Sequence, residues 1–283
     1  MQNFNFHQHT YRCGHADNNM QDEDYIKNYL DMGFKKIAFT DHCPEKERID
    51  PMDNVRMDYS QREEYLQSIS NLKEKYKDKI QILSGYEIEF LPGQEENLKE
   101  LKEESDILVL GQHFIYNKDG KTLKRIHDDK YTDEDLDTYA NYIETAVKLG
   151  LPDIIAHPDI YMRARDGFDK KAEEVARRIC EVAIKYNIPI EINLNNIFNR
   201  VFLNETKTGI NNYSLEEQYK RFERIRYPDA NFWKVVSEYD VKVVYGIDTH
   251  FANQIPKYNE LVNLATKIIG QETIDKLNFI KEL

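Results

Sequence analysis

Imidazole and carboxylate side chains recur at short spacings along this chain, and seven of its eight histidines belong to such groups. His7 and His9 stand two residues apart, as do Asp248 and His250. Side chains at positions i and i+2 of a β-strand point to the same side, so each pair can direct two ligands at one point. Imidazole nitrogens and carboxylate oxygens are ligands for divalent transition metals. The pattern therefore predicts a site that holds more than one metal ion.

The remaining candidate ligands each follow a separate apolar run of the sequence. They are His15, His42, Glu87, His113 and His157. One such residue at the end of a run is usually incidental, but random placement would put several histidines on helix faces. Only His127 lies elsewhere, in the polar segment KRIHDDKYTDED, where we expect an ordinary surface histidine. We therefore interpret the other seven histidines, together with the two carboxylates, as one multi-metal site.

Seven short runs rich in Ile, Val, Leu or Phe must carry these residues, and each is typical of a buried parallel strand. The predicted strands are Asn3–His9, Lys36–Cys43, Ile80–Phe90, Asp106–Phe114, Asp153–Pro158, Ile188–Leu194 and Val241–His250. Amphipathic segments between them predict helices, chiefly Met20–Met32, Gln61–Tyr76, Asp133–Leu149, Lys170–Tyr186 and Pro256–Ile269. The alternation predicts an α/β fold, a closed or nearly closed (β/α)7 barrel of the TIM-like kind. Its site is expected at the C-terminal ends of the strands.

The segment 196–233 interrupts this alternation because it is long, polar and aromatic. It contains four arginines, namely Arg200, Arg221, Arg224 and Arg226. One interpretation is a surface insertion with a helix over Leu215–Arg226, and the other is a loop that caps the mouth of the site. No low-complexity stretch or long linker divides the chain, so we expect residues 1–283 to form a single domain.

The bulk composition excludes several classes of partner. The chain has 51 acidic and 39 basic residues, a net charge of −12, which argues against extended contact with nucleic acid or anionic membrane. It has no run of 18 apolar residues, and residues 1–9 lack the pattern of a signal peptide. Three cysteines suit a reducing compartment without a disulfide framework. We therefore expect a cytoplasmic protein with a small-molecule substrate, and nothing in the sequence specifies its oligomeric state.

The order of these motifs resembles a known family. HxH, then His15, DH, Glu87, His113, His157 and DxH are similar to the motifs of the polymerase-and-histidinol-phosphatase (PHP) superfamily, from His7 to His250. Within it, the segment CGHA after the first motif resembles the stand-alone histidinol-phosphate phosphatases, which have a similar length. The resemblance implies the family fold, a distorted seven-stranded TIM-like barrel, in agreement with the strand count.

The resemblance also implies three divalent ions and distributes the ligands among them. One ion takes His7, His9, Glu87 and Asp248, a second takes Glu87 as a bridge with His113 and His157, and a third takes His15, His42 and His250. Zinc, iron and manganese all suit this donor set. Cys13 and Cys43 adjoin the motifs, but we interpret them as small buried residues. A hydroxide bridging two ions, held by His7, His9, Glu87 and Asp248, is the expected nucleophile that attacks phosphorus.

The activity implied is hydrolysis of L-histidinol phosphate to L-histidinol and phosphate in histidine biosynthesis. The main alternative is a PHP phosphoesterase that acts on another small phosphomonoester, a nucleotide or a phosphodiester. A metal amidohydrolase is disfavoured because no strand carries an embedded bridging lysine. A silent scaffold is disfavoured because no ligand position is lost.

Arginine side chains suit the outer phosphate oxygens because the planar guanidinium binds two of them at once. Arg163 and Arg200 follow strand ends and are the predicted phosphate contacts, although Arg165 competes with Arg163. Asp41 and Asp159 adjoin ligand histidines and are expected to orient them. The candidates for contact with the ammonium and imidazole of the substrate are Tyr116, Tyr161, Asn193, Asn195 and Glu89.

Overall fold

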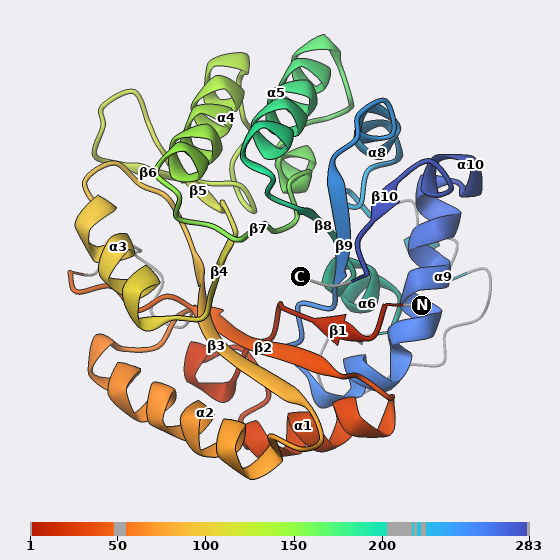
Figure 1. Ribbon diagram of the computed structural model, residues 1–283. Coiled ribbons are helices and arrows are strands. Elements are labelled where there is room, and N and C mark those ends of the chain that lie inside the picture. Colours follow the sequence, from red (N-terminus) through yellow and green to blue (C-terminus); the bar gives the residue numbers. More distant parts are fainter. Residues whose placement is uncertain (1, 48–54, 203–216, 218–219, 222–224, 282–283) are drawn as a thin grey trace.

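The apolar runs form the strands of one parallel sheet. The computed structural model describes residues 2–47, 55–202, 217, 220–221 and 225–281. Eight strands hydrogen-bond in the order β1-β2-β3-β4-β7-β8-β9-β10 (Figure 1). They are β1 (Phe4–Asn5), β2 (Lys36–His42), β3 (Gln81–Ile88), β4 (Ile107–Leu110), β7 (Ile154–Ile155), β8 (Ile190–Asn193), β9 (Lys242–Gly246) and β10 (Asn278–Phe279). Every neighbouring pair in this sheet is parallel.

All seven predicted runs contain a strand, but a closed seven-stranded barrel is not confirmed. The sheet has an eighth strand, β10, which lies outside the seven predicted runs. The strands β1 and β10 stand at the two ends of the strand order and are not paired with each other. Asn278 and Phe279 pair with Lys242 and Val243 at the start of β9. Because β10 occupies this edge of β9, β1 is not paired with β9 there. A single parallel bridge, between Gln8 and Thr249, joins the segments that follow β1 and β9.

Most of the helices lie on the outer side of the curved sheet, whereas α6 overlaps the strands in Figure 1. The helices are α1 (Asp22–Asp31), α2 (Arg62–Tyr76), α3 (Glu95–Glu104), α4 (Asp133–Lys148), α5 (Lys170–Tyr186), α6 (Asn195–Val201), α8 (Ala230–Val236), α9 (Tyr258–Ile269) and α10 (Gln271–Ile274). Short 3-10 helices are η1 (Tyr11–Cys13), η2 (Tyr59–Gln61), η3 (Ile160–Ala164) and η4 (Ala252–Lys257). The five predicted main helices are present, whereas most of the predicted helix Leu215–Arg226 lies outside the described residues.

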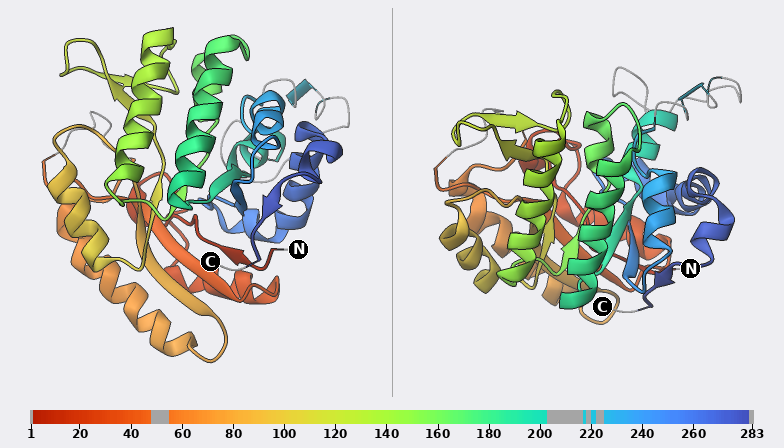
Figure 2. Two further views of the ribbon diagram at one scale, coloured as in Figure 1. Left: turned by 45° about the horizontal axis from the view of Figure 1, so that its top comes forward. Right: turned by 90° about the horizontal axis from the view of Figure 1, so that it is seen from above.

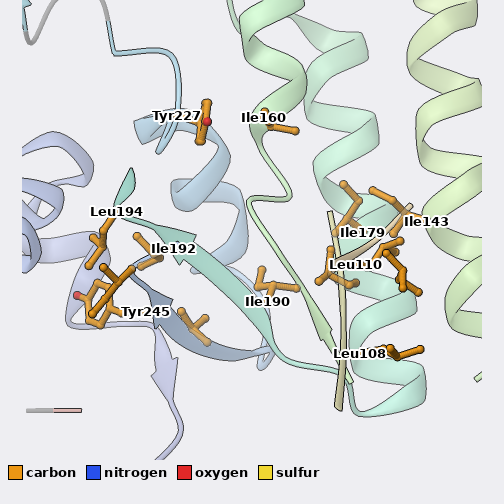
Figure 3. Packing of buried hydrophobic residues seen from close by; sticks show 14 of the residues in the cluster. Leu108, Leu110, Ile143, Ile160, Ile179, Ile190, Ile192, Leu194, Tyr227 and Tyr245 are labelled. Atoms are coloured by element: carbon orange, nitrogen blue, oxygen red, sulfur yellow. The ribbon is translucent and has the colours of Figure 1, made fainter. Parts of the chain in front are cut away.

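The alternation of side chains along β4 divides the buried residues between two hydrophobic clusters. Leu108 and Leu110 belong to the large cluster and face α4 and α5 (Figure 3). Ile107 and Val109 belong to a smaller cluster with Phe4. Because both faces of the strand are buried, its sequence reads as a continuous apolar run rather than an alternating one.

A two-stranded antiparallel hairpin follows β4. It consists of β5 (Phe114–Tyr116) and β6 (Leu123–Arg125), and Phe114 pairs with Arg125. Figure 2 shows this hairpin and α6 at the end of the molecule opposite the N-terminus. That end is the one where the parallel strands finish. In the described part of the chain, no helix is long and apolar enough to cross a membrane.

Candidate metal centre

The nine predicted ligands meet at the end of the sheet where the strands finish. His42 is the last residue of β2, and the others lie near the ends of β1, η1, β3, β4, β7 and β9. The backbone N–H of His9 donates to the carbonyl of Thr249 (2.9 Å), and Thr249 donates back to the carbonyl of His7 (3.2 Å). The HxH and DxH motifs therefore run side by side, as parallel strands would place them.

Glu87 lies at the middle of the cluster and is only 2% exposed. Its carboxylate oxygens lie 2.9 Å from His42 Nδ1 and 3.0 Å from His157 Nε2. The same oxygens lie 3.4 Å from His7, 3.5 Å from His9 and 3.8 Å from His113. One carboxylate thus faces five imidazole rings, which is the arrangement expected of a bridging ligand.

Gly111 makes room for this carboxylate. A Cβ atom at position 111 would lie 1.9 Å from Glu87 Oε1 and 2.6 Å from its Cδ. Any side chain there would overlap the group that faces the histidines. Glycine at this position is therefore required by a close approach and not by a turn.

Asp248 closes the opposite side of the cluster. Its Oδ1 lies 3.1 Å from His9 Nε2 and 3.6 Å from His7 Nε2. The side-chain amides of Asn193 and Asn195 both donate to Oδ2, at 3.1 Å each. Asp248 has φ +51, and His157 has φ +27. Residues other than glycine rarely occupy this left-handed region, so the surrounding packing holds both candidate ligands in a costly backbone conformation.

His15 and His250 face one another through ring nitrogens. Their Nε2 atoms are 2.8 Å apart, while Nδ1 of His15 lies 3.1 Å from the carbonyl of Cys13 and Nδ1 of His250 lies 3.0 Å from that of Asp248. A carbonyl oxygen only accepts, so each Nδ1 carries a proton and donates it. In the neutral rings the two Nε2 lone pairs therefore point toward each other.

This donor set fits divalent cations. Buried atoms without a hydrogen-bond partner include His7 Nε2, His9 Nε2 and Asp248 Oδ1. An unpaired buried polar atom costs about 1–3 kcal/mol, and a cation bound between these lone pairs removes that cost. Sets whose ligand atoms all lie within 4.8 Å of one another include His7–His9–Glu87, His7–His157–Asp248 and His9–His42–His250. His9 thus stands close to part of the predicted third set as well as to the first.

Charge coupling within the cluster shifts the pKa values of its members in opposite directions. Burial disfavours the charged form of His9, but its contacts with Asp248 and Asp41 outweigh burial and raise its pKa to about 9. The pKa of His15 falls to about 3, because burial and the neighbouring His250 and His9 all disfavour a proton there. Burial works against the charge of Glu87, yet the surrounding histidines hold the pKa of that carboxyl well below its usual range.

Cys13 also forms such a set with His15 and His250. Burial raises the pKa of the Cys13 thiol well above its usual value. The neutral thiol is a weaker metal ligand than the thiolate. This direction of shift favours the interpretation of Cys13 as a small buried residue.

Buried carboxylates hold three of the candidate ligands in orientation. His7 Nδ1 donates to Glu191 Oε2 (3.0 Å), and His113 Nδ1 donates to Glu89 Oε1 (2.9 Å). Asp41 Oδ1 lies 3.5 Å from His9 Nδ1, and its Oδ2 accepts from the backbone N–H of Thr10 (3.2 Å). Each contact directs Nε2 of the same ring into the cluster. The predicted role of Asp41, orientation of a ligand histidine, agrees with this geometry. Glu89 was a predicted substrate contact, but its carboxylate accepts a hydrogen bond from His113.

Glu191 was missed by the sequence reasoning. It is a charged residue inside the predicted strand Ile188–Leu194, two positions before Asn193, and a carboxylate in a strand buried on both faces was the available signal. A Cβ at Gly246 would lie 2.0 Å from Glu191 Oε2. Gly246 therefore leaves room for Glu191 as Gly111 does for Glu87.

Asp159 does not orient His157 as predicted. Its Oδ2 accepts hydrogen bonds from the backbone N–H of Asp229 (2.8 Å) and from Trp233 Nε1 (2.9 Å). Asp159 thereby ties the chain after β7 to the first turn of α8. Asp159 stands two positions after the candidate ligand His157, but its carboxylate contacts α8, which the local sequence does not reveal.

The other candidate substrate contacts have partners of their own. Tyr161 is buried, and its hydroxyl donates to the carbonyl of Ala172 (2.7 Å). Asn193 and Asn195 donate to Asp248 as described above. Tyr116 lines a cleft between the hairpin and α4 with Tyr142. Three of the five candidates, Asn193, Asn195 and Glu89, thus contact a predicted ligand directly.

Arg163 and Arg165 are separated by the structure. Arg165 donates to the carbonyl of Tyr131 (3.0 Å) and pairs with Asp133 (3.0 Å) and Asp169. Burial raises the pKa of the Tyr227 hydroxyl, and the nearby positive charge of Arg163 opposes this shift. The Tyr227 ring in turn packs against His157, with ring centroids 6.1 Å apart. Of the two arginines, Arg163 therefore borders the candidate centre.

Arg200 lies in the last turn of α6. Its carbonyl oxygen accepts a hydrogen bond from Arg221 Nη1 (3.4 Å). The first residue of the same helix, Asn195, contacts Asp248. The predicted contact between Arg200 and phosphate stays a prediction.

The prediction that His127 is an ordinary surface residue is wrong. Its ring lies nearly parallel to that of His113, with centroids 5.8 Å apart and an angle of 23° between the planes. Burial, followed by the positive charge of Arg163, lowers the pKa of His127 to about 2. The polar sequence around it predicted an exposed loop. The β5–β6 hairpin brings this loop back to His113, and no periodic pattern in the sequence predicted that hairpin.

Comparison with known proteins agrees with this geometry. A histidinol-phosphatase of Bacillus subtilis is 30% identical over 101 residues, which are 35% of this chain and 37% of that protein. A "Probable histidinol-phosphatase" of Deinococcus radiodurans is 28% identical over 162 residues, 54% of this chain and 59% of that protein. This chain therefore covers less than two thirds of the length of either curated relative.

Two solved structures share the fold. One is a protein of Listeria monocytogenes, provisionally assigned as a histidinol phosphatase, with TM-score 0.70, 18% identity and coverage of 91% of this chain and 98% of that one. The other is the histidinol phosphate phosphatase of Lactococcus lactis, in complex with zinc, L-histidinol and phosphate. Its TM-score is 0.61 at 18% identity, and the match covers 93% of this chain and 94% of that one. At these identities the likeness concerns the fold.

A family model gives the assignment. The model of the PHP domain matches residues 5–195, a range that includes seven of the nine candidate ligands, from His7 to His157. The match covers more than half of the chain, and this protein therefore belongs to the PHP domain family.

Proposed function

We propose that this protein is a metal-dependent phosphatase that hydrolyses L-histidinol phosphate to L-histidinol and inorganic phosphate, as a step of histidine biosynthesis. The observation that carries the proposal is the carboxylate of Glu87, which five histidines approach within 2.9–3.8 Å. Support for the substrate comes from the names of the two curated relatives and from the L-histidinol and phosphate in the Lactococcus lactis structure.

The proposal includes three divalent ions of zinc, iron or manganese. His7, His9, Glu87 and Asp248 would hold one ion, Glu87 with His113 and His157 a second, and His15, His42 and His250 a third. Bound divalent cations lower the pKa of water toward neutrality and neutralise charge on phosphoryl oxygens. The unpaired lone pairs of His7, His9 and Asp248 support such binding.

The chain's own residues have three tasks in this proposal. Glu191 and Glu89 each accept a hydrogen bond from Nδ1 of a candidate ligand ring, and Asp41 lies 3.5 Å from His9 Nδ1, so each would hold its ring with Nε2 directed toward the cluster. Asn193 and Asn195 hold the Oδ2 atom of Asp248.

The third task, binding the phosphoryl oxygens, falls to Arg163 and Arg200. The planar fork of a guanidinium matches two oxygens of a phosphate. The charge of Arg163 acts on Tyr227, whose ring packs beside His157, and this nearness supports the role of Arg163. Arg200 would approach from α6, whose first residue already contacts Asp248.

The proposal extends to the domain organisation of the chain and to the shape of its sheet. Residues 1–283 would form one domain, and the segment around 196–233, part of which lies outside the described residues, would cover the site. The ring of strands would be a distorted β/α barrel that β10 opens between β1 and β9. The parallel bridge between Gln8 and Thr249 supports this view. A cytoplasmic location agrees with three cysteines that are all free thiols.

The test is phosphate release by the purified protein after loading with zinc, iron or manganese. L-histidinol phosphate is compared with a nucleoside monophosphate, phosphotyrosine, a sugar phosphate and a small phosphodiester. We expect the highest kcat/KM for L-histidinol phosphate. A preference of about a thousandfold for another ester would replace this proposal with the alternative of another PHP phosphoesterase.

A substitution tests the metal assignment independently of the substrate. His113→Ala removes a ring that faces Glu87, and we expect loss of turnover on every ester together with a lower content of bound metal. Unfolding measured by circular dichroism serves as the control for folding. Full turnover by this variant would contradict the assignment of His113 as a ligand.

A further inference from the structure

The middle residues of the two ligand motifs, Gln8 of HxH and Thr249 of DxH, meet at a single residue of α1. Both are completely buried. Neighbouring side chains along an extended chain point to opposite sides, so Gln8 faces away from the side that His7 and His9 share. There the hydroxyl of Tyr29, which is 0% exposed, contacts both middle residues. One tyrosine of α1 thus joins the two motifs.

The Tyr29 hydroxyl uses its one proton and both of its lone pairs. It donates to Gln8 Oε1 (2.8 Å) and accepts from Asn5 Nδ2 (2.7 Å). Its oxygen lies 2.9 Å from Thr249 Oγ1. Because the single phenolic proton goes to Gln8, the threonine hydroxyl is the donor in this last contact. The Tyr29 oxygen therefore holds a side chain of each motif and one of β1.

Two of these side chains continue to the backbone of the motifs. Gln8 Nε2 donates to the carbonyl of His9, and Asn5 Nδ2 donates to the carbonyl of His7 (2.9 Å). Asn5 Oδ1 accepts from the backbone N–H of Ile247 (2.9 Å), one residue before the DxH motif. Since β10 pairs with the start of β9, this side-chain amide supplies a hydrogen bond that a neighbouring strand would otherwise provide.

The register of the two motifs thus rests on few contacts. In the described chain, two hydrogen bonds between backbone groups join them, His9 to Thr249 and Thr249 to His7. We propose that Tyr29 is a positioning residue that fixes the register between HxH and DxH. His9 Nε2 lies 3.1 Å from Asp248 Oδ1, so a slip between the motifs changes the spacing of candidate ligands. The inference rests on the proposed metal-dependent function and gives Tyr29 no contact with substrate.

Two variants of buried tyrosines on α1 test this role. Tyr29→Phe removes one oxygen atom and keeps the ring, which packs edge-on against Phe34 with centroids 5.1 Å apart. Tyr25→Phe is the matched control. Tyr25 lies one turn earlier on the same helix, is equally buried, and its hydroxyl has no hydrogen-bond partner among the described residues. The pair separates the hydrogen bonds of Tyr29 from the removal of a buried hydroxyl in general.

The first measurement is hydrogen exchange of the full chain after treatment with a chelator, followed by mass spectrometry. For Tyr29→Phe we expect the backbone amides of Ile247 and Thr249 to exchange about tenfold faster, with unchanged rates in β3. Tyr25→Phe should match the wild type in both segments. Wild-type exchange at Ile247 and Thr249 in Tyr29→Phe would overturn the inference. An equal increase in β3 would reveal a general loss of stability and would overturn it too.

The second measurement separates positioning of the motifs from a merely structural role. We expect Tyr29→Phe to bind zinc about tenfold more weakly in a titration and to lose about tenfold or more in kcat. A structural role alone would lower Tm and leave the zinc affinity and kcat at wild-type values, and that outcome would overturn the inference. Tyr25→Phe should keep the wild-type zinc affinity and kcat.

Failure of this inference is distinguishable from failure of the proposed function, because hydrogen exchange needs neither substrate nor metal. If the wild type hydrolyses L-histidinol phosphate and Tyr29→Phe exchanges and binds zinc as the wild type does, only the inference fails. If the wild type prefers another ester but Tyr29→Phe shows faster exchange and weaker zinc binding, only the substrate assignment fails.

Discussion

Gly111→Ala provides a direct test of the role of Glu87, because the added methyl group would occupy the space of the carboxylate. A Cβ at position 111 would lie 1.9 Å from Glu87 Oε1, 2.6 Å from Cδ and 2.9 Å from Cγ. Ordinary van der Waals contact begins at 3.4 Å, so the carboxylate must move by about 1.5 Å. It cannot do so and keep its contacts of 2.9 Å with His42 and 3.0 Å with His157.

The expected loss is much larger in activity than in stability. Misplacing a catalytic group by about 1 Å costs about a hundredfold in rate, and here the displaced group also faces several ligands. Overpacking a buried site costs about 1–3 kcal/mol of unfolding free energy, which the chain should tolerate while still folding. We therefore expect at least about a hundredfold lower kcat/KM with a Tm lower by only a few degrees.

The assay combines phosphate release from L-histidinol phosphate, metal content by mass spectrometry and thermal unfolding. Gly167→Ala is the matched control, because a Cβ at position 167 meets nothing within 4 Å, and it should match the wild type in all three measurements. Full metal content with wild-type turnover in Gly111→Ala would refute the placement of Glu87 as the central ligand. Loss of activity through global unfolding would appear as a large fall in Tm and would refute the expected separation of the two effects.

Three further predictions concern the residues around the cluster. Glu191→Gln removes the carboxylate that accepts the His7 Nδ1 proton, so we expect metal affinity to fall about 10–100-fold in a zinc titration. Glu173→Gln, on the surface of α5, is the control. An unchanged zinc affinity of the Glu191 variant would contradict its orienting role. Arg163→Ala should raise KM about 10–100-fold while the metal content stays unchanged. Arg165→Ala is the control and should leave KM unchanged, because Arg165 pairs with Asp133 and Asp169. Equal effects of the two substitutions on KM would argue against a phosphate contact at Arg163. Removal of metal by a chelator should abolish turnover and lower Tm. Zinc at about 100 times its Kd should then restore about 2.7 kcal/mol of unfolding free energy. A Tm that does not change with zinc would contradict metal binding by the candidate ligands.

Much of the fold followed from local patterns. Lys170–Tyr186 has an amphipathic period that predicts α5 to the residue, because one buried stripe suffices to define a surface helix. Each of the seven apolar runs contains a strand. The strand β10 was not predicted, because Asn278–Phe279 has only two residues and carries no pattern. Its pairing with β9 is what leaves the sheet open, so closure was beyond the reach of any local signal.

The candidate site, like the fold, was predictable from the sequence only in part. The sequence by itself determined the donor types and their placement at strand ends, since the two-residue period of a strand directs His7 and His9, or Asp248 and His250, to one side. Only the tertiary structure decided which groups meet. Glu191 contacts His7 across 184 positions, Asp159 turns to Trp233, and the hairpin brings His127 to His113. These contacts join different strands and loops, and the periodicity of one segment carries no information about the distance to another.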